Sequence, residues 1–454
     1  MKLKHLFLAS VAICAFAACS DDNNNGIDIP DSQEIETYLS LSAAPASDLK
    51  SKATDTEVGS GNESFINELT AYVFYEDGSF AATGTATAKD ASASVDRIEN
   101  VIVKVKASAA GELSPTMFKV ILLANVKFAG NPTNLSELEK GSFDDICKYA
   151  FTKVHSVSGE PTYLPMFSQI IEIGGGNDEA HMIKAGKDHV NWIVGGNVLS
   201  HDKNYTPKDA NDRIALTRHM ARVQLEMLNC DFTNNYTNAS FTLTDVYVAN
   251  VGNSSKLYAP ETAFSLQNVG DNYGVNDFVH GCTYNRGDYI LAEGVSGKDE
   301  LSKSYGKESG ILINKETHSN ATGSWYMFAD ATTTTTLEKL KQAMAQFYVF
   351  EFNKVNMKAD MNPTATTPSG EVNTMLVLKG EWSNNGMTDT RYYRIPIKEG
   401  DVTGVKRNNI YKVWATLTGE GSKDPDSKEL NTCVSFSVKV KPWDVVRQEE
   451  EDEN

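Results

Sequence analysis

The sequence has few of the residues that form disulfides, bind metals or carry out catalysis. Only 6 cysteines and 8 histidines occur among 454 residues. The cysteines beyond the first twenty residues stand far apart, at Cys147, Cys230, Cys282 and Cys433. Such spacing is not that of a disulfide framework, and no Cys/His cluster has zinc spacing. Buried thiols and one or two bridges both remain open, and we favour buried thiols.

Catalytic and cofactor-binding motifs are also missing. The chain contains no GxSxG nucleophile elbow, no phosphate-binding loop, no HExxH zinc motif and no dinucleotide fingerprint. A formal net charge of −18 argues against nucleic acid and anionic membranes as partners, because like charges repel. We therefore predict no enzyme activity, no cofactor and no bound metal.

Long apolar runs are missing except at the start of the chain. A short charged region, Met1–His5, precedes an apolar run from Leu6 to Ala18. This run is shorter than the roughly 20 residues of a spanning helix, so we interpret residues 1–18 as a signal peptide. Phe16–Cys19 resembles the lipobox of bacterial lipoproteins, with Phe16 in place of the usual aliphatic residue. We expect cleavage before Cys19 and acylation of its thiol (diacylglycerol, palmitate); an ordinary signal peptidase site is the alternative.

Alternation of apolar and polar residues with period two dominates the rest of the chain. Ile35–Ser42 and Leu69–Tyr75 are clear examples, and Phe118–Val126 is a nearly continuous apolar run typical of a central strand. Strands are also predicted at 101–105, 223–227, 241–249, 347–352, 375–378, 392–397, 410–418 and 434–440. The phase of alternation shifts between Leu243 and Val246, which predicts a β-bulge near Thr244–Asp245.

Helical patterns are rare, with the best at Pro132–Lys140 and Leu337–Ala345. Many strands, few helices and loops rich in Gly, Asn, Ser and Thr favour an all-β protein of two β-sandwich domains. A polar, proline-containing break at residues 200–212 predicts the domain boundary. We expect a tether with a first strand at 19–52, an N-terminal sandwich at 53–212 and a C-terminal sandwich at 213–454.

The order of several short motifs along nearly the whole chain resembles the fimbrillins, the subunits of type V pili in Bacteroidota. The likeness rests on Glu63–Gly78, Tyr163–Ser168, Leu216–Val223, Phe347–Asn353, Leu376–Gly380, Tyr392–Ile397, Arg407–Gly421 and Val438–Trp443. The C-terminal stretch looks most like the minor-fimbrium, Mfa-type branch. The resemblance implies transthyretin-like, Greek-key sandwiches and a structural pilin rather than an enzyme.

The resemblance also implies assembly by donor-strand exchange after proteolysis. The family's subunits cross the membrane as lipoproteins, lose a lipidated first strand to a trypsin-like protease, and fill the vacated groove with a neighbour's C-terminal strand. Laid on this chain, the removable strand is Ile35–Ser42. The processing site is Lys50 or Lys52, since the first arginine is Arg97, too far downstream. The donor residues are Val434, Phe436, Val438, Val440, Trp443 and Val445.

Two further interpretations of the same residues stay open. Lys50 and Lys52 are also compatible with an uncut anchor or a tip adhesin. The 434–440 run is also compatible with an ordinary closing strand, in which case Trp443–Arg447 is the exchanged part.

The expected partners are other pilus subunits, the outer membrane through lipid before maturation, and a host or bacterial surface receptor. The expected place is the fimbrium on the outer membrane, with a role in adhesion or biofilm formation. A surface glycan-binding lipoprotein that uses one of its five tryptophans is a second alternative, and a lipoprotein hydrolase the least favoured.

Overall fold

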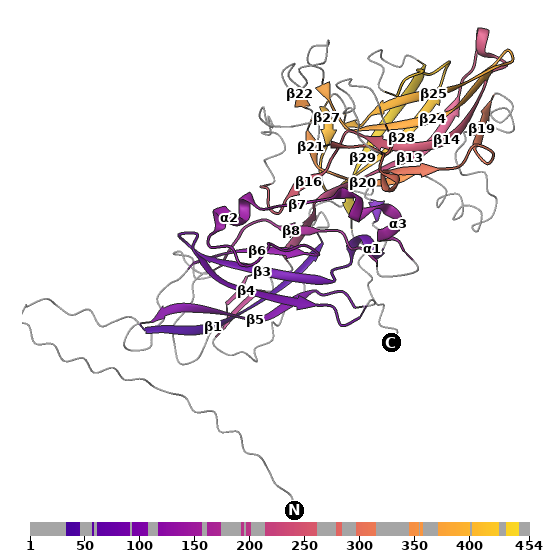
Figure 1. Cartoon of the computed structure of the whole chain (residues 1–454). Helices are drawn as coiled ribbons and strands as arrows, with labels where there is room; N and C mark the ends of the chain where they lie inside the picture. The colour runs from indigo at the N-terminus through magenta and orange to yellow at the C-terminus, as the bar shows by residue number, and fades with distance from the viewer. Residues whose placement is uncertain are drawn as a thin grey trace, which may run out of the picture.

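A computed structural model of the chain describes residues 33–45, 57–58, 61–90, 93–107, 117–156, 161–173, 192–194, 197–200, 214–260, 278–283, 297–314, 345–353, 355–356, 371–399, 402–425 and 433–444. Within these ranges the protein is built almost entirely of β-strands, arranged as two sandwiches (Figure 1). The prediction of an all-β protein with two sandwich domains and a few short helices is confirmed.

The first sandwich is formed by one ten-stranded sheet that folds over on itself. Its main path runs β10-β11-β1-β12-β8-β6-β3-β4, with β5 paired to β1 and β9 paired to β6. The strands are β1 (Gln33–Pro45), β3 (Glu68–Tyr75), β4 (Phe80–Thr87), β5 (Arg97–Ala107), β6 (Phe118–Ala124), β8 (Met166–Ser168), β9 (Ile171–Ile173), β10 (Trp192–Val194), β11 (Asn197–Ser200) and β12 (Ile214–Arg218).

The two layers of this sandwich meet closely where β4 crosses β5. A Cβ added at Gly84 of β4 would lie 2.5 Å from Val101 Cγ2 of β5, so only glycine allows the strands to approach this far. Leu69, Val73 and Val120, on the strands that lie beside β4 in its layer, are fully buried in the shared core. The alternation seen in the sequence therefore corresponds to side chains that point into one core.

The second sandwich packs two five-stranded sheets, ordered β2-β29-β28-β13-β20 and β18-β14-β24-β25 with β19 on β14. Their strands are β2 (Glu57–Val58), β13 (Met220–Cys230), β14 (Ser240–Ala249), β18 (Ser302–Ser304), β19 (Ile311–Asn314), β20 (Gln346–Phe350), β24 (Met375–Asn384), β25 (Met387–Pro396), β28 (Asn409–Leu417) and β29 (Val434–Asp444). The β14–β24 register shifts between Leu243 and Asp245, which confirms the predicted bulge.

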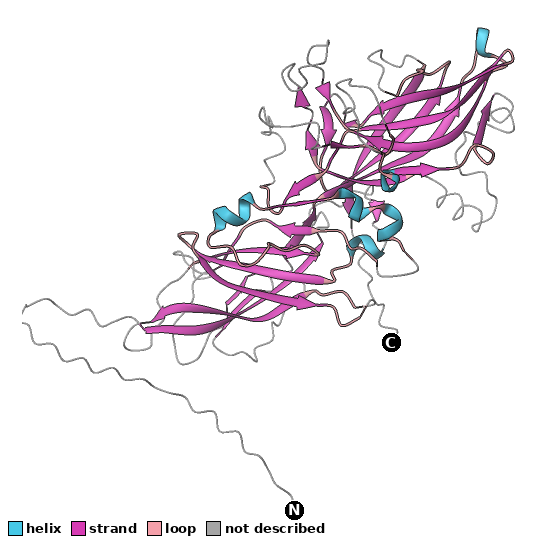
Figure 2. Ribbon diagram, viewed as in Figure 1, coloured by secondary structure: helices cyan, strands magenta, loops and turns pink. Residues whose placement is uncertain are grey.

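Short sheets and helices complete the described fold. The short strands are β7 (Ser142–Asp144), β15 (Val251–Gly252), β16 (Ser254–Lys256), β17 (Phe278–Val279), β21 (Phe352–Asn353), β22 (Val355–Asn356), β23 (Glu371–Val372), β26 (Lys398–Glu399) and β27 (Val402–Val405). The helical turns are α1 (Gly61–Ser64), α2 (Leu135–Lys140), η1 (Ile146–Tyr149), α3 (Phe151–Val154), η2 (Asn234–Tyr236) and η4 (Asp299–Leu301). Figure 2 shows α1 and α3 gathered where the two sandwiches meet.

Helix α2 confirms the prediction at Pro132–Lys140, and its start explains why. Asn134 Oδ1 accepts the Glu137 backbone N–H at 2.9 Å, while Glu137 Oε2 accepts the Thr133 N–H at 2.7 Å. This reciprocal capping satisfies two donors that a helix start otherwise leaves unpaired. The helix predicted at Leu337–Ala345 lies almost wholly outside the described residues, as does the polar break at 200–212.

The chain crosses from the first sandwich to the second at a single residue. β12 ends at Arg218 in the first sheet, and β13 begins at Met220 in the second. His219, between them, is buried, and its Nε2–H donates a 3.1 Å hydrogen bond to the Leu257 carbonyl. Burial lowers the pKa of His219 from 6.5 to about 4, so this residue is a neutral core histidine at physiological pH.

Candidate functional site

The strand predicted to be removable, Ile35–Ser42, lies within β1, in the interior of the first sheet. β5 runs antiparallel along β1, from Gln33↔Ala107 to Ser42↔Arg97. The opposite edge of β1 pairs first with β11, at Tyr38–Ser40, and then in parallel with β12, at Ala43–Pro45. Both edges of this strand are therefore hydrogen-bonded, and β1 switches neighbours as it passes from one layer to the other.

The side chains of β1 fill the core of the first sandwich. Leu39, Leu41 and Ala43 are fully buried and belong to one apolar cluster with β3, β5 and β6. Burying a leucine side chain contributes about 1.5–3 kcal/mol. Removal of β1 would expose an apolar groove and the unpaired backbone edge of β5, both of which are costly in water.

The predicted lipidation and processing residues cannot be placed in the fold. Cys19, Lys50 and Lys52 all lie outside the described residues. The next described segment is β2, which begins at Glu57, a few residues after Lys52 along the chain.

Most of the predicted donor residues lie on β29, which closes one sheet of the second sandwich. β29 pairs antiparallel with β28 from Asn409↔Pro442 to Leu417↔Val434. Val434 is buried, and Phe436, Val438 and Val440 are partly buried against the core of this sandwich. Val445 lies outside the described residues. In the isolated chain, β29 is thus a strand of its own sheet, with its apolar face half covered.

Trp443, near the end of β29, is buried between two arginines and a tyrosine at the junction of the sandwiches. Its ring stacks on Tyr348 at a centroid distance of 5.8 Å and an interplanar angle of 9°. The Arg218 and Arg222 guanidinium carbons lie 4.7 Å and 5.4 Å from the ring centroid. Two cation–π contacts at a desolvated site stabilise this position by about 1–2 kcal/mol each.

Glu63 of α1 supplies the negative charge that balances this junction. Its carboxylate oxygens accept two hydrogen bonds from Arg222 Nη1, at 2.8 and 2.9 Å, and a further one from the Tyr348 hydroxyl. Burial raises the pKa of Glu63, but His155, Arg222 and Tyr348 outweigh it and lower this pKa from 4.5 to about 2. A buried carboxylate held ionised in this way joins α1 to two strands of the second sandwich.

No local sequence pattern distinguishes Glu63, Arg218, Arg222 or Tyr348 as a cluster. The one sequence feature that indicates it is the presence of two arginines within the strand-like run Leu216–Val223. Buried arginines need acceptors, so their presence in a strand pattern indicates a partner elsewhere in the chain. The identity of that partner, 155 or more residues away, is a property of the fold alone.

No metal or membrane site emerges from the described residues. They contain no group of three His, Cys, Asp or Glu side chains able to hold a metal, and none of their helices is long and apolar enough to span a membrane. No disulfide joins Cys147, Cys230, Cys282 and Cys433, which all lie in the described residues.

Residues 37–218 match the family model of the major fimbrial subunit protein (FimA). This match confirms the resemblance to fimbrillins over that part of the chain. The family that this model describes is one of major fimbrial subunits, which agrees with the predicted structural pilin.

Solved structures with the same fold span nearly the whole chain. A fimbrilin (fimA) from Porphyromonas gingivalis W83 is 15% identical, with a TM-score of 0.51, and the match covers 90% of this chain and 98% of that one. A candidate cell adhesion protein from Parabacteroides distasonis ATCC 8503 is 18% identical, with a TM-score of 0.53 and coverage of 91% and 100%. No curated protein matches the sequence. The finer likeness to the Mfa-type branch stays a prediction, since the family match ends at residue 218.

Proposed function

We propose that this chain is a pilin exported to the outer membrane as a lipoprotein acylated on Cys19. A protease then cuts after Lys50 or Lys52 and releases β1 with its lipid. The groove left by β1 accepts the C-terminal strand of a neighbouring subunit, and repetition of this step builds a fimbria that supports adhesion or biofilm formation. Such contacts are heterologous and do not close on themselves, so they extend into a filament.

The observation that carries this proposal is the position of β1. A strand with both edges paired and its leucines fully buried leaves, on removal, a groove shaped for another strand. Strand addition satisfies the exposed backbone groups through hydrogen bonds, while alternate side chains fill the pockets. β1 also precedes the predicted cut, so one cleavage detaches it from the rest of the fold.

The proposed donor is the segment that carries Val434, Phe436, Val438, Val440, Trp443 and Val445. Its alternate side chains present the apolar face that a groove strand needs, and β29 already has the extended conformation. Since β29 is an edge strand over most of its length and Phe436, Val438 and Val440 are only partly buried, this part of β29 costs less to release than β1.

The mature N-terminus tests this function. Fimbriae sheared from cells should begin at Ser51 or Ala53, and a Lys50→Ala, Lys52→Ala double variant should stay monomeric with acylated Cys19. Lys89→Ala and Lys127→Ala form the matched control, because both lysines lie on described segments that stay in the mature protein. Deletion of the residues after Pro442 should abolish ladders on unheated gels. Fimbriae whose subunits all begin at acylated Cys19 would refute cleavage and favour an uncut anchor or tip adhesin.

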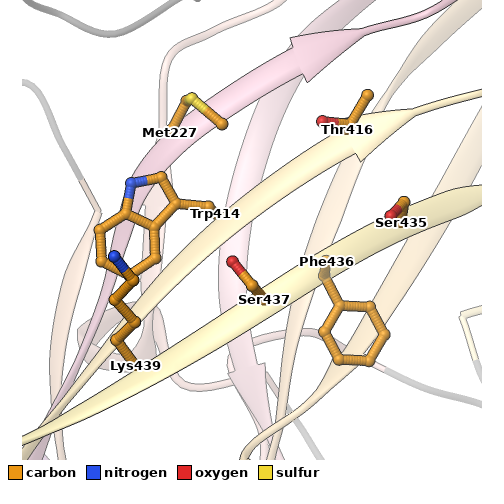
Figure 3. Close-up of a pocket in the computed structure, with 7 residues that line it drawn as sticks. All are labelled: Met227, Trp414, Thr416, Ser435, Phe436, Ser437 and Lys439. Atoms are coloured by element: carbon orange, nitrogen blue, oxygen red, sulfur yellow. The ribbon is translucent and has the colours of Figure 1, made fainter.

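A pocket on the outer face of the second sandwich favours glycan binding as a second function. Met227, Trp414, Thr416, Ser435, Phe436, Ser437 and Lys439 line an open pocket of about 420 Å³ (Figure 3). The Lys439 Nζ lies 5.0 Å from the Trp414 ring centroid. An indole face beside hydroxyls and an ammonium group provides stacking and hydrogen bonds for a sugar ring. Trp382 and Trp443, by contrast, are buried.

A glycan array tests this second function on the monomer. Binding should be lost in Trp414→Ala and retained in Met387→Ala, whose side chain is 75% exposed on the other sheet. Equal binding by both variants, or no binding by the wild type, would exclude the Trp414 pocket as a glycan site.

A further inference from the structure

One short strand, β12, touches both strands that the proposed function exchanges. Its first residues, Ile214–Leu216, pair in parallel with Ala43–Pro45 at the end of β1. Its last residue, Arg218, reaches the end of β29. Two residues of extended chain separate these contacts, about 7 Å. β12 therefore joins the two contacts through one short strand.

Arg218 binds the end of β29 from a fully buried position. Its guanidinium donates to Asn408 Oδ1 at 3.1 Å and to the Trp443 carbonyl at 3.5 Å, and it covers the Trp443 ring. The same group donates to the Glu63 carbonyl and to Ser64 Oγ, both at 2.9 Å. Arg218 thus contacts α1, the residue before β28 (Asn408) and the end of β29.

The segment that follows the predicted cut also pairs with the end of β29. β2 pairs in parallel with the end of β29, Glu57 opposite Trp443 and Val58 opposite Asp444. Only these two register pairs cover the outer edge of β29 among the described residues. The segment that becomes the mature N-terminus therefore lies directly on the candidate donor.

We infer that β12, through Arg218, couples the groove to the donor, so that a subunit releases the end of β29 only after its own β1 has been removed. This inference rests on the proposed function. While β1 is present, the first half of β12 pairs with β1 and the second half, which ends at Arg218, pairs with β8, so the whole strand is held in place. Without β1, β12 becomes an edge strand held by three pairs to β8, and the hold on Trp443 loosens. Precursors are thereby kept from donating before they can accept.

A seeding assay tests the coupling with the whole protein. Fluorescent uncleaved precursor, whose groove is plugged and which can only donate, is mixed with sheared wild-type fimbriae, and incorporation into heat-labile ladders is timed. Cleaved wild-type protein should add to the fimbriae readily, and uncleaved wild-type protein at least tenfold more slowly. Uncleaved Arg218→Met should add at nearly the rate of the cleaved protein, because the loss of each charge-assisted hydrogen bond favours release of the strand by about a factor of ten. Arg391→Met is the matched control, a buried arginine bound to Glu420 and Asp389 far along the second sandwich.

Hydrogen exchange on the uncleaved monomer separates this inference from the proposed function. Residues 434–444 should exchange about tenfold faster in Arg218→Met than in wild type or Arg391→Met, and this needs no polymerisation. Equal seeding by cleaved and uncleaved wild type, or equal acceleration by both arginine variants, would refute the coupling while strand exchange stands. Failure of cleaved wild type to seed, with the exchange difference intact, would instead refute the proposed function.

Discussion

Leu41→Ala should destabilise the precursor and leave the mature fimbria unaffected. Leu41 lies on β1, is fully buried, and packs in the same cluster as Leu69 and Val120. Truncation of a buried leucine costs about 2–5 kcal/mol, the lost transfer energy plus a cavity. We take about 3 kcal/mol, because the site lies between two closely packed layers. At a slope near 2 kcal/mol per molar urea, the unfolding midpoint of the first sandwich should fall by about 1.5 M.

The comparison is made between two forms of the same variant. Unacylated precursor, made with Cys19→Ala, is unfolded in urea while near-ultraviolet circular dichroism follows the tertiary structure, and sheared fimbriae are treated in parallel. Leu69→Ala on β3 is the control, because Leu69 is equally buried but stays in the mature subunit. It should weaken both forms. A lowered midpoint in Leu41→Ala fimbriae, or an unchanged one in the precursor, would refute the assignment of β1 as the strand that is lost.

Three further predictions follow from the described side chains. The pKa of Glu63 is about 2 in the folded protein and 4.5 in the unfolded chain, so its stabilisation of about 3 kcal/mol is complete above pH 4.5 and is lost as the pH falls toward 2. The unfolding midpoint should therefore fall less steeply with decreasing pH in Glu63→Gln than in the wild type. Burial raises the pKa of the Cys147 and Cys230 thiols to about 11, so both should resist maleimide at pH 7 until the protein is denatured, and rapid labelling of the native protein would contradict this. Gly380→Ala should cost about 1–3 kcal/mol in thermal unfolding, because its Cβ would lie 2.2 Å from the Thr242 carbonyl oxygen, and an unchanged melting temperature would contradict that clash.

Local patterns predicted the parts of the fold that local physics determines. The period-two runs at Ile35–Ser42 and Leu69–Tyr75 became β1 and β3, because successive side chains of a strand point to opposite faces; in β3 both faces are buried. The bulge near Thr244–Asp245 was visible for the same reason, as a change of phase. Capping residues likewise predicted α2.

Contacts between segments that are distant in the sequence could not be predicted from local sequence patterns. Glu63 and Arg222 are separated by 159 residues, and either residue alone is compatible with a solvated charge. The strand neighbours of β1 were equally hidden, since β11 and β12 follow it by more than 150 residues. Motif order through the fimbrillin resemblance pointed to the right segments, Glu63–Gly78 and Leu216–Val223, but not to the side chains that join them.

The different burial of β1 and β29 gives a physical reason why the proposed strand exchange requires proteolytic cleavage. β1 is paired on both edges along part of its length and has fully buried leucines, whereas β29 has one long paired edge and, between the buried Val434 and Trp443, apolar side chains that are only partly buried. An uncut subunit therefore holds its own β1 in place at an effective concentration that no separate strand can match. A donor from outside cannot displace that strand at equilibrium, because it competes against an intramolecular partner already packed in the core. Cleavage removes this advantage irreversibly, since a strand that dissociates after the cut is lost to dilution. The proposed strand exchange thus depends on the proposed cut between β1 and β2.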